Sequence, residues 1–145
     1  MKRSAAVLTA LLALALPVQA SAAATNYRGK TKQGLKASAR VVDGRLKLLK
    51  INWKVPCEHG RWTDRTYWED RPEGPIEHDG SKFTDGGKER VKFDDGSVDY
   101  NLKLAGDFTN ERIKGKMTAK LKLYDRSGEL IDSCRGTIFF TLPRA

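Results

Sequence analysis

The residues whose side chains are best suited to catalysis or ligand binding lie in one segment, 58–90. This segment holds both histidines of the chain, His59 and His78, together with many carboxylates. Imidazole and carboxylate groups are ligands for zinc. However, the spacing matches no metal-binding pattern, and Glu77, His78 and Asp79 cannot all point to one side of a strand, because successive side chains alternate. We therefore predict no metal site and no cofactor.

The carboxylates of residues 58–79 also raise the question of hydrolysis. A glycosidase needs two carboxylates across a cleft, and a small single domain gives little room for one. The chain has no Gly-x-Ser-x-Gly motif that would present a nucleophilic serine. We predict no catalytic residues, and a small secreted hydrolase that uses these carboxylates is an alternative hypothesis.

Aromatic side chains are the second notable feature of the same segment. The side chains of Trp62, Tyr67 and Trp68 have large apolar faces and one polar N–H or O–H group each, which suits the stacking of a sugar ring. We predict a ligand-binding surface here, formed by these three residues with His59 and His78. The alternative is that Trp62 and Trp68, an even number of positions apart on one strand face, fill the core.

A ladder of lysines marks the C-terminal half. Lys114, Lys116, Lys120 and Lys122 share one face of an alternating segment. The equivalent faces of earlier segments carry Lys36, Arg40, Lys50 and Lys54. We predict an anion-binding face if these strands are neighbours. The alternative is an ordinary solvated face, where lysine also discourages edge-to-edge aggregation.

The elements that position these groups follow from a period-2 pattern that dominates the sequence after residue 34. Inward residues of the clearest segments include Leu49, Ile51, Trp53, Val55 and Cys57, then Ile113, Met117, Ala119 and Leu121, and finally Cys134, Ile138 and Phe140. Such alternation indicates antiparallel strands with one wet face. No window favours a helix. Asp43-Gly44, Asp95-Gly96 and the stretch 125–128 predict hairpin turns, and a change of phase predicts a β-bulge near Leu48.

These segments predict an all-β fold, either an antiparallel β-sandwich or a partly closed β-barrel of about seven to nine strands. Residues 58–90 break the pattern as a long aromatic and acidic insertion, in which 61–69 and 76–83 are candidate strands. Both cysteines, Cys57 and Cys134, lie on inward positions, 77 residues apart. We predict a disulfide between them, which would stabilise the fold by about 4 kcal/mol in the chain-entropy model.

The N-terminus predicts export. Lys2 and Arg3 precede an uncharged apolar stretch, and small residues then offer cleavage after Ala20, Ala22 or Ala24. This is the pattern of a secretory signal peptide over 1–24, and it agrees with an even cysteine count. The remaining 25–145 forms one domain, predicted to be secreted or to lie at the cell envelope, with no transmembrane segment.

The charge balance points to anionic partners. The chain has a net charge of +9, which favours acidic polysaccharides or other envelope polymers. A secreted chain rarely meets nucleic acid, so none is expected as a partner.

One resemblance can be named. The stretch 27–34, a strand that ends in Cys57, the Gly-Asp-Phe turn at 106–108, the Ile-x-Gly at 113–115 and the Cys-x-Gly-Thr at 134–137 resemble small uncharacterised exported proteins of actinobacteria. The resemblance implies an all-β exported domain and transfers no functional residues. We predict a non-enzymatic binding domain, with the hydrolase and a β-barrel carrier of an apolar ligand as alternatives.

Overall fold

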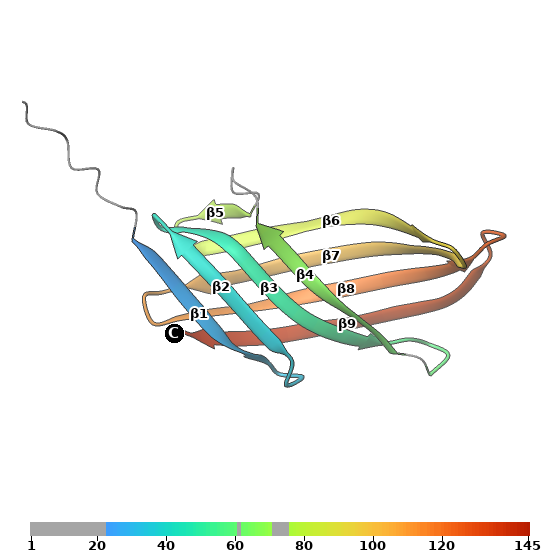
Figure 1. The fold of residues 1–145 in the computed structure, drawn as a ribbon, viewed down its shortest axis with the longest axis horizontal. Helices are drawn as coiled ribbons and strands as arrows, with labels where there is room; N and C mark the ends of the chain where they lie inside the picture. The colour runs from blue at the N-terminus through green and yellow to red at the C-terminus, as the bar shows by residue number, and fades with distance from the viewer. Residues whose placement is uncertain (1–22, 61, 71–75) are drawn as a thin grey trace, which may run out of the picture.

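The computed structural model describes residues 23–60, 62–70 and 76–145, with the backbone alone for 62–70, 77 and 78. These residues form nine antiparallel β-strands in a single sheet (Figure 1). In chain order the strands are β1 (Ala24–Thr31), β2 (Lys36–Val42), β3 (Arg45–Pro56), β4 (Trp62–Asp70), β5 (Glu77–Asp79), β6 (Lys82–Phe93), β7 (Gly96–Phe108), β8 (Arg112–Asp125) and β9 (Leu130–Pro143). The predicted all-β, antiparallel fold is confirmed, and no helix occurs in the part of the chain just defined.

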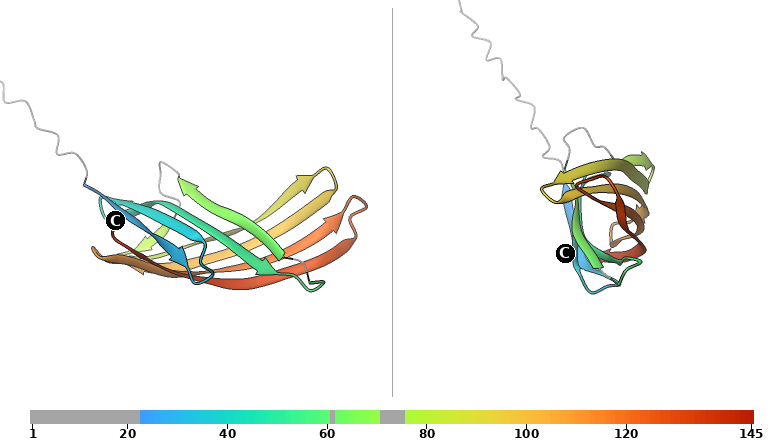
Figure 2. Two further views of the ribbon diagram at one scale, coloured as in Figure 1. Left: turned by 60° about the horizontal axis from the view of Figure 1, so that its bottom comes forward. Right: turned by 90° about the vertical axis from the view of Figure 1, so that its right-hand side faces the viewer.

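The sheet consists of two meanders that meet at one narrow seam. Its strand order is β4-β3-β2-β1-β9-β8-β7-β6-β5, so β1 of the first meander lies beside β9 of the second. The seam is a single strand pair, in which β1 pairs with β9 at Lys30–Thr141 and Thr31–Phe140 and the pairing continues at the Tyr27–Arg144 bridge. The two halves therefore fold over one another, as the end-on view in Figure 2 shows. The result is an open, strongly curled sheet between the two predicted architectures, and it is not a closed barrel.

The inner face of both halves forms one core. Alternate residues of β3, among them Leu49, Ile51 and Trp53, are almost completely buried. They pack with inward residues of β8 and β9, such as Met117 and Ile138. Burial of such side chains contributes roughly 1.5–3 kcal/mol each. The inward and outward positions predicted for these strands are confirmed.

Two local predictions on β2 and β3 are confirmed. Asp43 and Gly44 connect the strands with φ of 50° and 69°, the left-handed values that a tight hairpin turn needs. Further along, Arg40 pairs with Leu48 whereas Val41 pairs with Leu46, so Lys47 is the extra residue of a β-bulge. The bulge restores the burial of Leu46 on the same face as Leu49, which resolves the change of phase seen in the sequence.

The turn predicted at Asp95-Gly96 is wrong by one residue. Phe93 pairs with Gly96, so the connecting residues are Asp94 and Asp95. Gly96 opens β7 against the backbone of Tyr124, where an added Cβ would lie 2.0 Å from the Tyr124 carbonyl oxygen. The glycine is therefore needed for a close approach between strands, not for the turn itself.

Segment 58–90 is also more regular than its sequence suggests. It contributes β4, near the candidate strand 61–69, and β5 with most of β6. The second candidate strand, 76–83, is instead a hairpin, because Asp79 pairs with Lys82 around Gly80 with φ of 59°. Most of the predicted insertion therefore belongs to the sheet.

Candidate functional site

The predicted aromatic surface lies on the edge strand β4. The backbone register places Trp62 opposite Pro56, Tyr67 opposite Ile51 and Trp68 opposite Lys50. The side chains of these three residues, and that of His78 on β5, lie outside the described part of the structure. Their role in ligand binding, or in the core, stays a prediction.

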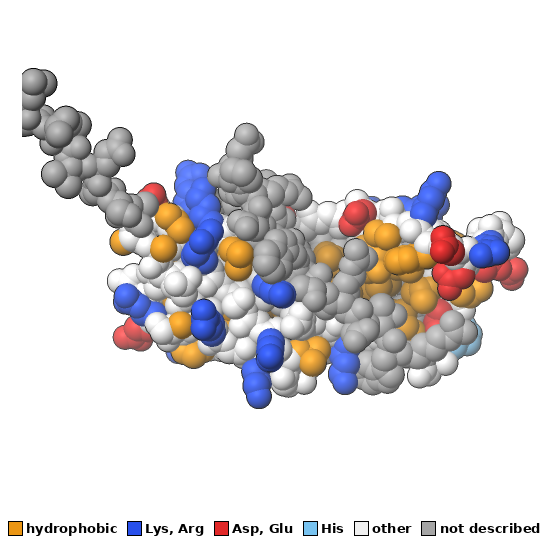
Figure 3. All heavy atoms as spheres, viewed as in Figure 1, with side chains coloured by type: hydrophobic (Ala, Val, Ile, Leu, Met, Phe, Trp, Pro, Cys, Tyr) orange, Lys and Arg blue, Asp and Glu red, His pale blue; other side chains and the backbone are white. Residues whose placement is uncertain are grey.

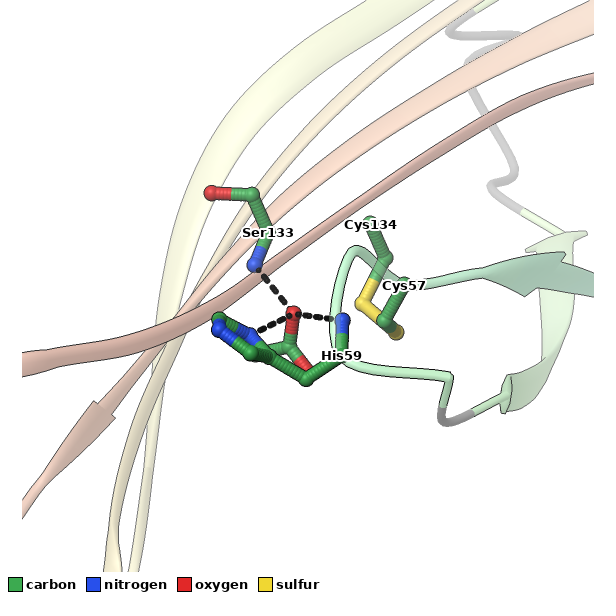
Figure 4. Close-up of a disulfide and its surroundings, with 5 residues drawn as sticks. Cys57, His59, Ser133 and Cys134 are labelled. Atoms are coloured by element: carbon green, nitrogen blue, oxygen red, sulfur yellow. Dashed lines mark hydrogen bonds and ion pairs between the residues drawn. A yellow bond between two sulfur atoms is a disulfide. The ribbon is translucent and has the colours of Figure 1, made fainter.

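His59 follows the predicted disulfide, which the structure confirms. Cys57 and Cys134 are joined, with their Cα atoms 3.8 Å apart, and fasten the end of β3 to β9 (Figure 4). The Cys57–Cys134 pair is also a β-bridge. Next to it, the backbone N–H of Glu58 donates to the carbonyl oxygen of Ser133. The chain thereby continues along β9 for one more residue before it turns away at His59.

His59 contacts a buried carboxylate, that of Asp132, which the strand alternation places on the inward face but which sequence analysis did not identify as a partner of His59. One oxygen of Asp132 accepts hydrogen bonds from the backbone N–H of His59 at 3.3 Å and from that of Ser133 at 2.8 Å. The same oxygen lies 3.1 Å from the imidazole Nδ1 of His59. The side chain of Asp132 is 0% exposed, whereas that of His59 is 66% exposed. The signal in the sequence is the place of Asp132 in the apolar alternation, two residues before Cys134.

The surroundings of Asp132 set its ionisation. Burial raises the pKa of the carboxylate, but the hydrogen bonds from His59 and Ser133 outweigh this effect and hold the pKa below its usual value of 3.8. Asp132 is therefore ionised at neutral pH, and its charge fixes the loop that carries His59.

The arrangement of His59 and Asp132 resembles the orienting half of a catalytic triad, but it lacks the other half. A carboxylate that holds an imidazole needs a nucleophile on the second nitrogen. No hydroxyl or thiol of a described residue bonds to this imidazole. The described residues also contain no group of three histidine, cysteine or carboxylate side chains suited to a metal ion. The pair anchors the loop beside the disulfide.

The carboxylates proposed for hydrolysis do not meet where their side chains are described. Glu58 lies beside Ser133 on β9, and strand pairing through β8 and β7 aligns Ser133 with Arg90 on β6. Asp79 pairs with Lys82, at the start of β6. At about 3.3 Å per residue, the positions of Lys82 and Arg90 on β6 are on the order of 25 Å apart. Glycosidase carboxylates lie roughly 5–9.5 Å apart, so Glu58 and Asp79 are not such a pair.

The predicted lysines of β8 all lie on the outer face, which we define as the side of the sheet opposite the core. Lys114, Lys116, Lys120 and Lys122 are exposed there. Strand pairing aligns Lys120 with three residues of neighbouring strands, so that one row across the sheet reads Lys88, Asn101, Lys120 and Arg135. The adjacent outward row reads Arg90, Asp99, Lys122 and Ser133.

An open groove of about 690 Å³ lies along these two rows. Five cationic residues line it, namely Lys88, Arg90, Lys120, Lys122 and Arg135. Three carboxylates, those of Glu58, Glu89 and Asp99, also line it, so cations outnumber acids in its lining. We call this surface the basic groove.

One cation of the basic groove is already paired. The guanidinium of Arg90 donates to both carboxylate oxygens of Asp99, at 2.5 and 2.7 Å, and stacks over the ring of Tyr124 at 5.1 Å. The hydrogen bond from Arg90, opposed by burial and aided by the nearby charge of Lys122, lowers the pKa of Asp99. Arg90 is thereby held in place, and the amines of Lys88, Lys120 and Lys122 supply the remaining positive charge with Arg135.

The lysine faces of the two halves merge at the seam. Lys36 on β2 pairs with Lys30 on β1, Lys30 pairs with Thr141 on β9, and Thr141 pairs with Lys114 on β8. Beside this row, Lys32 lies 5.6 Å from the centre of the exposed Phe139 ring, and Phe139 pairs with Lys116. An extended basic face was predicted on the condition that the strands with lysines are neighbours. This condition is met for Lys36.

A smaller hollow of about 270 Å³ continues the basic surface onto the first half. Arg28, Lys36 and Lys50 line it together with small and polar residues. Figure 3 shows several Lys and Arg side chains spread over this side of the molecule. Arg40 is likewise exposed on β2, and the amide of Lys54 on β3 donates to the side chain of Gln33.

Comparisons with known proteins leave the class of protein at an all-β domain with one disulfide and a basic outer face. No protein-family model, no curated protein and no solved structure matches the chain. Among the residues that the structure describes, no helix is long and apolar enough to span a bilayer. The predicted signal peptide falls largely on residues 1–22, which lie outside the described chain.

Proposed function

We propose that this chain is a non-enzymatic binding domain that works outside the cytoplasm, where its outer basic face binds an anionic polymer of the cell envelope. The observation that carries the proposal is the alignment of cations from separate strands into rows along the basic groove. The apolar leader with its cleavage sites supports the location. A disulfide is consistent with an oxidising compartment.

The geometry suits a polymer better than a small ligand. Residues two apart on a strand, such as Lys120 and Lys122, are about 7 Å apart, and neighbouring strands are about 4.8 Å apart. The cations therefore form a shallow array on an open surface and do not converge on one point. Lysine amines are flexible, hydrated point charges, which match a repeating anionic chain with little stereochemical demand.

Binding to two polyanions and one neutral polymer tests the proposal. Polyphosphate carries phosphate, alginate carries carboxylate, and dextran carries no charge. We expect the chain to bind at least one of the two polyanions and not dextran, with affinity that falls at high ionic strength because salt screens exposed charges. Biolayer interferometry with immobilised polymer gives the affinity, and the two anionic arms distinguish phosphate from carboxylate recognition.

A matched pair of variants locates the surface. The double variant Lys120→Glu with Lys122→Glu reverses two charges in the basic groove and is expected to weaken binding at least about tenfold. Arg45→Glu with Lys47→Glu makes the same change in net charge at the β2–β3 hairpin, and should change affinity less than about twofold if location matters. Equal losses in both variants, or no binding to either polyanion, would contradict the proposal.

A further inference from the structure

Among the described residues, no strand pairs with one edge of β6 along most of its length. β5 pairs with β6 only at Lys82–Thr84, whereas β7 pairs with the whole of β6 on the other side. In the described sheet, residues 85–93 therefore have a strand on one side alone. An unpaired strand edge presents a row of backbone donors and acceptors that can pair with another chain.

Alternate residues of β6 direct their backbone N–H and C=O groups away from β7, in the plane of the sheet. Asp79 and Lys82 form the last pair of a tight hairpin, so even-numbered residues of β6 present N–H and C=O toward the β5 side. The N–H of Gly86 is satisfied locally by the carboxylate of Asp85. Within the described chain, no hydrogen bond is found to the backbone N–H and C=O groups that Lys88 and Lys92 direct away from β7.

Apolar surface lies beside the same edge on the inner face. Val91, Val98 and Leu123 pack against the core but are only partly buried, and Phe93 at the end of β6 is 51% exposed. Figure 3, compared with Figure 1, shows an apolar area near the ends of β6, β7 and β8. The first meander does not extend over this end of the second one (Figure 1).

We propose that the open edge of β6 binds an extended segment of a partner protein, which adds a strand beside residues 88–93. The sheet dictates the chemistry of that segment. On the outer face, its side chains lie beside Lys88 and Lys92, so acidic residues are favoured, whereas Arg90 is already paired with Asp99. On the inner face, they lie beside the exposed Glu89 and cover Val91 and Phe93, so apolar residues are favoured beside the latter two. The partner strand therefore alternates acidic and apolar residues.

A second copy of this chain fits the edge poorly. Two β6 edges in antiparallel contact would place the cations Lys88, Arg90 and Lys92 of one copy against those of the other. Like charges directly opposite on paired strands are destabilising. The lysines thus disfavour pairing between copies and attract an acidic strand, which assigns the edge to a different protein.

A short fluorescent peptide that alternates glutamate with valine and phenylalanine tests this proposal by fluorescence anisotropy. We expect saturable binding to the full chain, and no binding of the same peptide with lysine in place of glutamate. A version that is N-methylated on alternate backbone nitrogens keeps the side chains but loses the donors that a strand must supply. If the methylated peptide binds as tightly as the parent, the proposal is wrong.

Variants of Lys88 separate backbone pairing from charge. Lys88→Pro removes an edge-facing N–H at a position where an edge strand tolerates proline, and should weaken binding at least about tenfold. Lys88→Ala removes only the charge and should weaken it about two- to threefold. Equal affinities of the two variants would contradict strand addition. The Lys120→Glu, Lys122→Glu variant should bind the peptide normally, and loss of binding there would place the peptide in the basic groove instead.

Discussion

Among single residues, Asp132 combines full burial with a negative charge. Its carboxylate faces the apolar interior beside the disulfide, and one of its oxygens accepts three contacts from His59 and Ser133 (Figure 4). The other oxygen has no hydrogen-bond partner in the described structure. A buried acceptor that lacks a partner is costly, whereas the bonded oxygen of the same carboxylate holds the loop that carries His59.

Asp132 predicts a dependence of stability on acid. Its pKa is lower in the folded chain than the usual 3.8, so the unfolded chain binds more protons in that range. The stabilisation is therefore complete above the unfolded pKa and is lost as the pH falls through the folded pKa. In urea titrations, we expect the difference in unfolding free energy between the wild type and Asp132→Asn to shrink below about pH 4. A difference that is independent of pH would contradict this assignment.

Sequence alone did not find Asp132, for a physical reason. A single aspartate within a strand is ordinarily a solvated residue, and only the partners of its oxygens show that it is structural. His59 was identified as a candidate, but its partner lies 73 residues away, on a strand whose neighbours cannot be deduced from one chain. The lysines of β8 were easier to place, because their face follows from strand periodicity alone.

At the scale of secondary-structure elements, two paired glycines make room for aromatic rings. Gly106 on β7 pairs with Gly115 on β8. An added Cβ at Gly106 would lie 2.5 Å from the ring of Phe83, and one at Gly115 would lie 2.6 Å from the ring of Phe140. Both rings are buried, so neither can move into solvent.

The replacement Gly115→Ala should therefore destabilise the fold. Overpacking of a rigid core costs about 1–3 kcal/mol, and chemical denaturation monitored by tryptophan fluorescence measures it. Gly87→Ala is the matched control, because a Cβ there meets no atom within 4 Å. The explanation fails if the two alanine variants have the same stability.

The strands differ in how clearly their sequences predict them. β8 and β9 have an apolar residue at nearly every inward position, and both were predicted close to their observed bounds. β1 was missed, because its inward residues are Tyr27, Gly29 and Thr31, and only the first carries a hydrophobic signal. β5 and the start of β6 were merged into one candidate strand, 76–83, and the middle of β6 was not recognised because residues 84–90 lack apolar side chains.

At the scale of the whole molecule, the disulfide and the short backbone pairing beside it fasten the two meanders at a point away from the seam. The seam between β1 and β9 lies near one end of β9, whereas Cys134 lies toward the other end. Strand order and the seam could not be read from local patterns, because both depend on which distant edges meet. The inward phase of the two cysteines, by contrast, was sufficient to predict the bridge.

Removal of the bridge by Cys57→Ser with Cys134→Ser should lower the free energy of unfolding by about 2–4 kcal/mol. The effect should be greatest at the end of β3, because the bridge and the adjacent bond from Glu58 hold that end against β9. Hydrogen exchange should accordingly quicken in β3 and β4 before it does in β7 and β8. Uniform acceleration across the sheet would contradict a local clamp.

The seam has a consequence for the order in which the fold can be completed. Among the described strands, β9 is the one of the second meander that pairs with β1, and it is synthesised after the other eight. An incomplete chain that stops before Leu130 holds two unattached sheets with bare interiors. Such non-local closure is slow and leaves apolar surface exposed to aggregation, so we expect the two meanders to stay unjoined until β9 has been synthesised.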